Sequence, residues 1–399
     1  MDILLQILIF IEPLSFYIKK FEIGYIILFS VISIIYLKRN NNIKFALWET
    51  PLKFYFLFLV TSMISELILF ITNKEVFKLS FSPYSRVVIY FLIMITIINI
   101  SKTKDIFKKI ISTVIISSII PSFVAIIQLK YDVFTIINSL EGQRRLGSTF
   151  DHPNFYAFFL VIVIICLFYE IEKAQNGLKK SLLYLYTFLS IILLVFTYAR
   201  TPLFALVGII IIYLFRYVFF NGRQKYLKIV TICFALLFFT LSVYYVLHSE
   251  IFVTSRFNIS TTENSGSFTW RLGKWNSSLM YWLGNVKNIL IGSGWVTARE
   301  FGTNLAYKGY DMHNEILRII FDTGVIGFAF YFSYFVSVIK YSININLDKA
   351  KRKFIFNLTV VLVLGCSNDN ILIVPESCIV LIILLVLTYA NTLYWNRPE

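Results

Sequence analysis

Residues 154–171 read NFYAFFLVIVIICLFYEI, an apolar run whose only charged side chain is Glu170. A helix of about 20 mostly apolar residues is long enough to cross the hydrocarbon core of a bilayer. In lipid, backbone amides must be hydrogen-bonded within their own segment, so a run of this kind predicts a transmembrane helix. This stretch therefore indicates an all-α integral membrane protein.

The rest of the chain repeats the pattern. Hydrophobic residues make up 58% of the 399 positions and charged residues 15%, whereas soluble domains are nearer half apolar and a quarter charged. The beginning of the chain lacks the basic segment and cleavage site of a signal peptide, so its first apolar run counts as a span. We predict a single polytopic membrane domain over residues 1–399 with about twelve transmembrane helices, at approximately 3–18, 21–37, 54–71, 84–100, 106–128, 154–171, 181–198, 202–220, 226–247, 314–340, 354–373 and 376–395.

Lysine and arginine are divided unevenly between the two sides of this arrangement. The loops on one side hold 21 basic residues, and the short loops on the other side hold nine. The positive-inside rule makes the richer side cytoplasmic, together with both termini. The net charge of +15 is thus partly a topology signal, and its spread over many loops argues against a nucleic-acid partner.

One large loop, about residues 249–313, is predicted to lie outside the cytoplasm and to carry short amphipathic helices. Within residues 269–282, apolar side chains recur at steps of three and four, which predicts a helix lying in the membrane interface. The loop ends in Asp311-Met-His-Asn-Glu315, which contains one of three histidines and meets an apolar helix. Its basic residues suit an anionic substrate; they are Arg256, Arg271, Lys274, Lys287, Arg299 and Lys308.

Residues 144–154, RRLGSTFDHPN, precede a predicted span on the same side. Pro153 fits the first turn of that helix, and Asp151 or His152 could cap it. One interpretation is a capped helix start with arginines reaching the lipid headgroups. The other is an arginine pair beside a helix N-terminus, which is a natural anion site.

Two shorter stretches allow similar alternatives. Residues 197–202, TYARTP, place Arg200 in a short outer turn, where it either reaches lipid headgroups or faces a cavity. The turn Gly292-Ser-Gly294 either lines an anion site with its amides or is a plain turn.

The spacing of Glu315, Arg318 and Asp322 predicts ion pairs along one helix, with lysine tolerated at position 318.

Several motifs are missing from the sequence. It contains no P-loop, no HExxH and no Asp-x-Asp motif, and its four cysteines have no CxxC spacing. The cysteines therefore suggest neither a metal site nor a disulfide framework. We expect no metal and no cofactor.

Four features occur here in the same order as in the O-antigen ligase and O-antigen polymerase superfamily. They are RLGSTFDHPN at 145–154, YART at 198–201, the region from Trp270 to Gly294, and His313-Asn314 followed by DTGVIG at 322–327. The chain resembles that superfamily over nearly its whole length. The resemblance implies a metal-independent, GT-C-like glycosyltransferase. Its donor would be an undecaprenyl-diphosphate-linked oligosaccharide, used at the periplasmic face of the bacterial inner membrane.

The resemblance also implies roles for particular residues. Arg200 and Arg271 would hold the diphosphate, since arginine grips phosphate oxygens at two points. His313 would orient or deprotonate the acceptor hydroxyl, because histidine titrates near neutral pH. Further candidates for binding the diphosphate or glycan are Arg144, Arg145, Asn154, Lys274 and Asn314.

The acceptor distinguishes three possible functions. We favour an O-antigen polymerase, which joins lipid-linked repeat units, because heavy use of Ile, Phe, Lys and Asn resembles the AT-rich coding of polysaccharide gene clusters. The first alternative is an O-antigen ligase that transfers the glycan to lipid A-core; the second is a flippase or other transporter. A protein O-glycosyltransferase is expected to have a longer C-terminal portion. The expected partners are the lipid-linked donor and acceptor and the phospholipid bilayer, with a chain-length regulator protein as a candidate.

Overall fold

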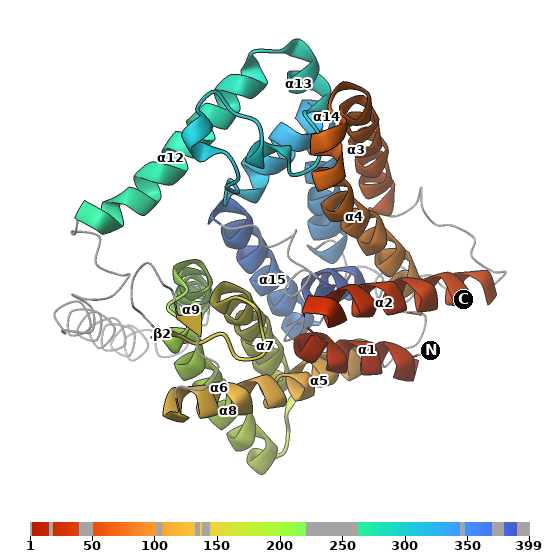
Figure 1. Cartoon of the computed structure of the whole chain (residues 1–399). Coiled ribbons are helices and arrows are strands. Elements are labelled where there is room, and N and C mark those ends of the chain that lie inside the picture. Colours follow the sequence, from red (N-terminus) through yellow and green to blue (C-terminus); the bar gives the residue numbers. More distant parts are fainter. Residues whose placement is uncertain are drawn as a thin grey trace.

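A computed structural model describes residues 2–15, 19–39, 51–100, 106–131, 136–137, 144–220, 262–343, 348–368 and 379–388. This part of the chain is helical apart from turns, short connections and one antiparallel pair of two-residue strands, β1 (Ile136–Ile137) and β2 (Arg144–Arg145). Figure 1 shows the helices gathered into a bundle. The predicted all-α class is confirmed for these residues.

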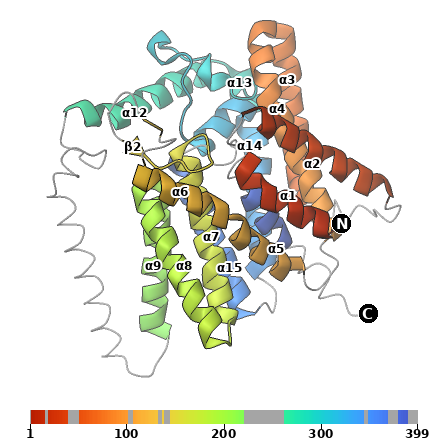
Figure 2. The ribbon, with the colours of Figure 1, turned by 60° about the horizontal axis from the view of Figure 1, so that its bottom comes forward.

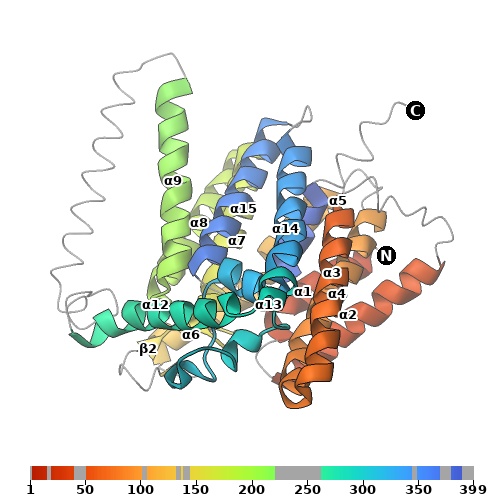
Figure 3. The ribbon, with the colours of Figure 1, turned by 90° about the horizontal axis from the view of Figure 1, so that it is seen from above.

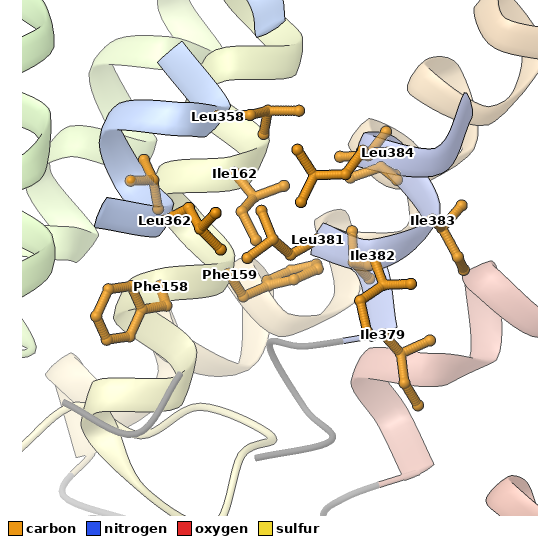
Figure 4. Close-up of a cluster of buried hydrophobic side chains, with 14 of the residues drawn as sticks. Phe158, Phe159, Ile162, Leu358, Leu362, Ile379, Leu381, Ile382, Ile383 and Leu384 are labelled. Carbon is orange, nitrogen blue, oxygen red and sulfur yellow. The ribbon is translucent and has the colours of Figure 1, made fainter. Parts of the chain in front are cut away.

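The apolar run at 154–171 forms α7 (Pro153–Lys173), which lies at the centre of the bundle. It packs against α5 (Ile106–Ser117), α8 (Gly177–Phe196), α9 (Arg200–Phe220) and α15 (Lys349–Asn368). A helix that is apolar on all sides is buried on all sides, and 83% of its span-forming residues are buried. Lipid is as apolar as these side chains, so close van der Waals packing holds the helices together. Figure 4 shows part of this packing, with Phe158, Phe159, Ile162, Leu358, Leu362, Ile379, Leu381, Ile382, Ile383 and Leu384.

A second group of helices packs beside the first. In it, α3 (Leu52–Thr72) contacts both α4 (Lys74–Ile100) and α14 (Glu315–Ile343). The helix α14 bends at Gly324, whose φ of 70° lies in the left-handed region that favours glycine. Two N-terminal helices complete this side: α1 (Asp2–Ser15) packs on α5, and α2 (Lys19–Arg39) packs on α4.

Six of the described helices are long and apolar enough to cross a membrane: Leu52–Thr72, Lys74–Asn99, Ile106–Tyr131, Pro153–Lys173, Gly177–Phe196 and Glu315–Lys340. Their length and composition support a multi-pass membrane protein, and the count of twelve stays a prediction. The span predicted at 226–247 lies outside the described residues. Two boundaries differ from the prediction. The helix α4 begins before the apolar run, at Lys74, and the span at 106–128 is divided at Ser118 into α5 and α6 (Ile119–Tyr131).

The large loop is described from Thr262 onward. It holds α12 (Thr262–Leu283), α13 (Val286–Ile291) and two single-turn 3-10 helices, η1 (Thr297–Arg299) and η2 (Leu305–Tyr307). The helix predicted over 269–282 is part of α12, which is longer than expected. It lies across one end of the bundle, where α9 and α14 begin (Figures 2 and 3).

The tryptophan-bearing face of α12 packs on the protein. Trp282 is buried with Met312 and Phe321, and Trp275 and Leu279 pack against the same cluster. This face was expected to lie in the membrane interface. Because the loop after α13 folds back under α12, the protein supplies the apolar surface that lipid was expected to supply.

Candidate functional site

Arg200 is the first residue of α9, at the end of a three-residue turn that follows α8. The turn is tight: Tyr198 has a φ of 51°, and Thr197 Oγ1 accepts a hydrogen bond from the Ala199 amide at 3.2 Å. The Arg200 side chain is half-buried. A cation at a helix N-terminus adds to the positive end of the helix dipole. Arg200 and the start of α9 together therefore favour an anion at this position.

Arg145 lies beneath this turn and is only 2% exposed. Its Nε donates to the Thr197 carbonyl at 3.1 Å, and its Nη2 donates to Asn154 Oδ1 at 2.8 Å. The predicted binding residues Arg145 and Asn154 are thus bonded to each other. The arginine supports the turn from inside the protein, which corrects the expectation that it extends toward the lipid headgroups.

The loop that carries Arg145 is itself anchored. Gln128 of α6 accepts from the Ser148 amide at 2.8 Å and donates to the Ser148 carbonyl at 3.1 Å. The Nδ1 of His152 accepts from the Asn154 amide at 3.1 Å, and Pro153 begins α7. The predicted capped helix start is therefore confirmed, with His152 as the cap. Arg144 pairs with Ile137 through its backbone in β2, and its side chain lies outside the described part.

Two predicted cationic residues lie on α12. Arg271 is half-buried near the middle of the helix. Lys274 is 1% exposed, and its Nζ donates to the Ala298 carbonyl. Burial lowers the pKa of the Lys274 amine to about 8, although the carboxylates of Asp311 and Glu300 act in the opposite direction. The amine of Lys274 therefore bonds to the loop beneath α12, and its predicted contact with the diphosphate or glycan stays a prediction.

His313 precedes α14 and is half-buried, with a φ of 47°. The cap of α14 is its neighbour: Asn314 Oδ1 accepts from the Leu317 amide at 3.0 Å, and the Asn314 carbonyl accepts from the Arg318 amide at 3.0 Å. Asn314 is thus the residue whose side chain caps this helix, and His313 lies just before the cap. The oxygen of the Asn314 side chain serves the helix, so a contact of this residue with substrate would have to use its amide nitrogen.

The turn Gly292-Ser-Gly294 fits tightly against α14. A Cβ atom on Gly292 would lie 2.2 Å from the Asp322 carbonyl oxygen, and one on Gly324 would lie 2.3 Å from that of Leu290. Both glycines also have positive φ, of 90° and 70°. They are thus required by a close approach of two backbones, at the point where α14 bends.

The amides of residues 293–296 are used inside the protein. They donate, in chain order, to the Phe321 carbonyl, the Asp322 carbonyl, the Glu66 carboxylate and the Asp322 carboxylate. The hypothesis of an anion site at this turn is therefore wrong for an external anion. The carboxylates of Glu66 and Asp322 occupy the position that a bound anion would take.

The predicted ion pairs of Arg318 are confirmed, but they are buried inside the protein. Arg318 is 1% exposed; it bonds to Glu315 and, at 2.8 Å, to Asp322, and its guanidinium carbon lies 4.4 Å from the Trp295 ring centroid. Glu66, which accepts a hydrogen bond from the Trp295 amide, could not be predicted as part of this cluster, because α3 lies far away along the chain. Tolerance of lysine at position 318 is therefore no longer expected.

The three predicted catalytic residues lie on or beside elements at one end of the bundle. Arg200 begins α9, Arg271 lies on α12, and His313 comes two residues before α14; α9 and α14 begin at the end of the bundle that α12 crosses (Figures 2 and 3). Arg145 and Asn154 lie beneath the α9 start, and the Lys274 side chain extends from α12 to the loop beneath it. These last three residues support the site from inside the protein.

Residues 185–332 match a family whose description is O-antigen ligase. The matched segment includes Arg200, Arg271 and His313, and no curated protein matches the chain. Members of this family are glycosyltransferase-like enzymes, either polymerases or ligases. The predicted resemblance to the O-antigen ligase and polymerase superfamily is confirmed over residues 185–332, which contain three of the four motifs; the motif at 145–154 lies outside the matched segment.

Proposed function

We propose that this chain is a surface-polysaccharide polymerase that joins undecaprenyl-diphosphate-linked repeat units at the periplasmic face of the bacterial inner membrane. One observation carries the proposal: Arg200, Arg271 and His313 all fall in the matched family segment, at the same end of the helix bundle. That arrangement suits a reaction between two membrane-anchored substrates.

Charge stabilisation is the first part of the proposed chemistry. The leaving group is a diphosphate on a lipid, and its negative charge grows as the glycosidic bond breaks. Arg200, with the positive end of the α9 dipole, and Arg271 of α12 would hold its oxygens. Preorganised donors of this kind contribute about 3–4 kcal/mol each to transition-state stabilisation. They need no metal ion to do so.

Proton transfer is the second part. The acceptor is a sugar hydroxyl of another lipid-linked chain, whose oxygen forms the new bond as the diphosphate leaves. His313 would take the hydroxyl proton. His313 directly precedes Asn314, whose side chain caps α14, so it lies where the loop meets this helix.

The orientation of the protein in the membrane belongs to the same proposal. The end of the bundle away from α12 carries the ion pairs Lys173–Asp348, Lys179–Glu170 and Lys353–Glu172. This lysine-rich end suits the cytoplasm. We further propose that both termini face the cytoplasm, which is the side that the positive-inside rule predicts for them. A cysteine at Leu305, which is 79% exposed in the loop, tests the orientation in a background without native cysteines. Labelling from outside intact spheroplasts is expected, and labelling only after lysis contradicts it.

The ligase function is a second candidate, because the matched family is described as O-antigen ligase. Both enzymes use the same donor and differ in the acceptor. Deleting the gene and separating the surface polysaccharide on a gel distinguishes them. Loss of a polymerase leaves one repeat unit on the anchor, and this is the expected result. Loss of a ligase leaves none, and loss of a flippase leaves none while the lipid-linked intermediate accumulates inside.

A further inference from the structure

His313 is held in a backbone conformation that few residues other than glycine adopt. Its φ of 47° lies in the left-handed region, which non-glycine residues occupy in only a few per cent of cases. Such a conformation persists where the surrounding structure fixes it. The contacts on each side of His313 therefore decide where its ring lies.

Two neighbours of His313 are fixed in different ways. On one side, Asn314 is bonded into the first turn of α14. On the other side, the Met312 side chain is fully buried, and its carbonyl accepts a hydrogen bond from Trp275 Nε1 at 2.5 Å. That carbonyl belongs to the peptide bond that enters His313. The indole of Trp275 thus restrains this peptide directly from another element.

Trp275 lies one helical turn after Arg271 on α12. Its hydrogen bond therefore joins the helix that carries Arg271 to the peptide bond beside His313. We propose that Trp275 is a positioning residue, which sets the place of the His313 ring relative to Arg271. The proposal rests on the proposed function for the roles of Arg271 and His313, while the hydrogen bond is independent of it.

The competing explanation is that Trp275 only packs against its apolar neighbours and does not position His313. Trp282 provides a matched control for this packing role. Both tryptophans lie on the same face of α12 and pack in the same apolar cluster. Trp282 is 8% exposed, and its Nε1 has no hydrogen-bond partner in the described part of the chain. Replacing either by phenylalanine removes part of a packed ring, but only Trp275→Phe also removes a hydrogen bond to the loop.

The first measurement follows the reactivity of His313 itself. The full chain in nanodiscs is treated with diethyl pyrocarbonate, and modification of each histidine is followed by peptide mass spectrometry, with exposed His152 as internal reference. We expect His313 to react about fivefold faster in Trp275→Phe, which is the population change that one hydrogen bond controls. We expect the wild-type rate in Trp282→Phe. An unchanged rate in Trp275→Phe, or an equal change in both variants, overturns the proposal.

A second substitution covers the case in which Trp275→Phe does not fold. Incorporating 3-benzothienylalanine at position 275 keeps the bicyclic ring and replaces the N–H group by sulfur. The same acceleration of His313 modification is expected there, because only the donor is lost. A wild-type rate in this isostere shows that packing alone holds the loop, and overturns the proposal.

The last measurement is turnover with a lipid-linked repeat unit. A displaced His313 ring should lower kcat about ten- to hundredfold with little change in the donor KM, and Trp282→Phe should keep the wild-type kcat. A wild-type kcat in Trp275→Phe overturns the positioning role. If the wild-type chain itself transfers no glycan, the proposed function fails, while the reactivity of His313 still decides whether Trp275 positions it.

Discussion

The Nε of Arg145 lies 3.1 Å from the carbonyl oxygen of Thr197, and this bond joins two motifs that are 52 residues apart. Thr197 begins the tight turn that ends at Arg200. Arg145 therefore acts on the site through the turn. It is bonded on its other side to Asn154 of α7, so the central helix fixes where α9 begins.

Replacing Arg145 by lysine should destabilise the protein. Lysine cannot reach the Thr197 carbonyl and Asn154 together, and losing hydrogen bonds to a buried charged group costs about 1.5–3 kcal/mol. We expect a lower melting temperature in detergent and a parallel loss of transfer. The control is Arg352→Lys, at an exposed position in the first turn of α15. A wild-type melting temperature in Arg145→Lys contradicts the supporting role.

Arg200→Lys and Arg271→Lys should lower transfer without lowering stability, in contrast to Arg145→Lys. Both positions are half-buried, so folding should be little affected. Lysine keeps the charge but loses the planar two-point grip on phosphate, so transfer should fall about 10²-fold in each variant. Rates and melting temperatures are measured together at matched protein levels. Near-normal transfer by both variants argues against their contact with the diphosphate.

Arg318→Lys should lower the stability of the folded protein. The helical spacing of Arg318 predicted that lysine would be tolerated. The guanidinium bonds two buried carboxylates, those of Glu315 and Asp322, and stacks on Trp295. Disrupting a buried ion pair of this kind costs about 3–5 kcal/mol. Thermal unfolding of the purified variant checks this, with Arg352→Lys again as the control. A melting temperature equal to that of the wild type would show that lysine satisfies both carboxylates.

Lys274 should make stability depend on pH in alkaline solution. The unfolded chain keeps the lysine proton up to about pH 10.5, whereas burial lowers the pKa in the folded protein to about 8. The folded state is therefore penalised below pH 8, and the penalty fades as the pH rises toward 10.5. We expect Lys274→Met to be more stable than the wild type at pH 7, by on the order of 1 kcal/mol or about 2 °C in melting temperature.

The difference between the two proteins should shrink between pH 8 and pH 10. A scan of melting temperature against pH for wild type and Lys274→Met checks the direction, and other titrating groups cancel in the comparison. A difference that is constant with pH would mean that Lys274 keeps its proton in the folded protein throughout this range.

Helix positions could be predicted well where the apolar run itself defines the helix. The run at 154–171 became α7 because hydrophobicity on all faces demands burial on all sides. Hydropathy does not detect the break at Ser118, where one predicted helix is divided into two. A serine hydroxyl can hydrogen-bond within an apolar helix or mark its end, so the residue type alone does not distinguish the two cases. It also cannot detect the polar first turns of α4, which extend beyond the apolar run.

The candidate site was predictable in its residues and less so in their roles. Helical spacing is the same for an exposed and a buried ion pair, so it could not show that Arg318 is buried and stacks on Trp295, which lies elsewhere in the chain. Sequence spacing likewise could not show that the amides near Gly292 bind the protein's own carboxylates. Arg145, Lys274 and Trp275 have structural partners that only the folded chain brings near them.

The central claim is that His313, with Arg200 and Arg271, transfers glycan from an undecaprenyl-diphosphate donor. The most direct measurement uses the purified chain in nanodiscs with a lipid-linked repeat unit and a metal chelator, comparing wild type with His313→Asn. Asparagine is a good residue at a helix start and tolerates the left-handed backbone, so the fold should be kept. The account predicts lipid-linked dimers and longer chains from the wild type, with release of undecaprenyl diphosphate, and no chains from His313→Asn, although it still binds the donor. Equal chain formation by His313→Asn, or none by a wild-type protein that binds the donor, would contradict the account.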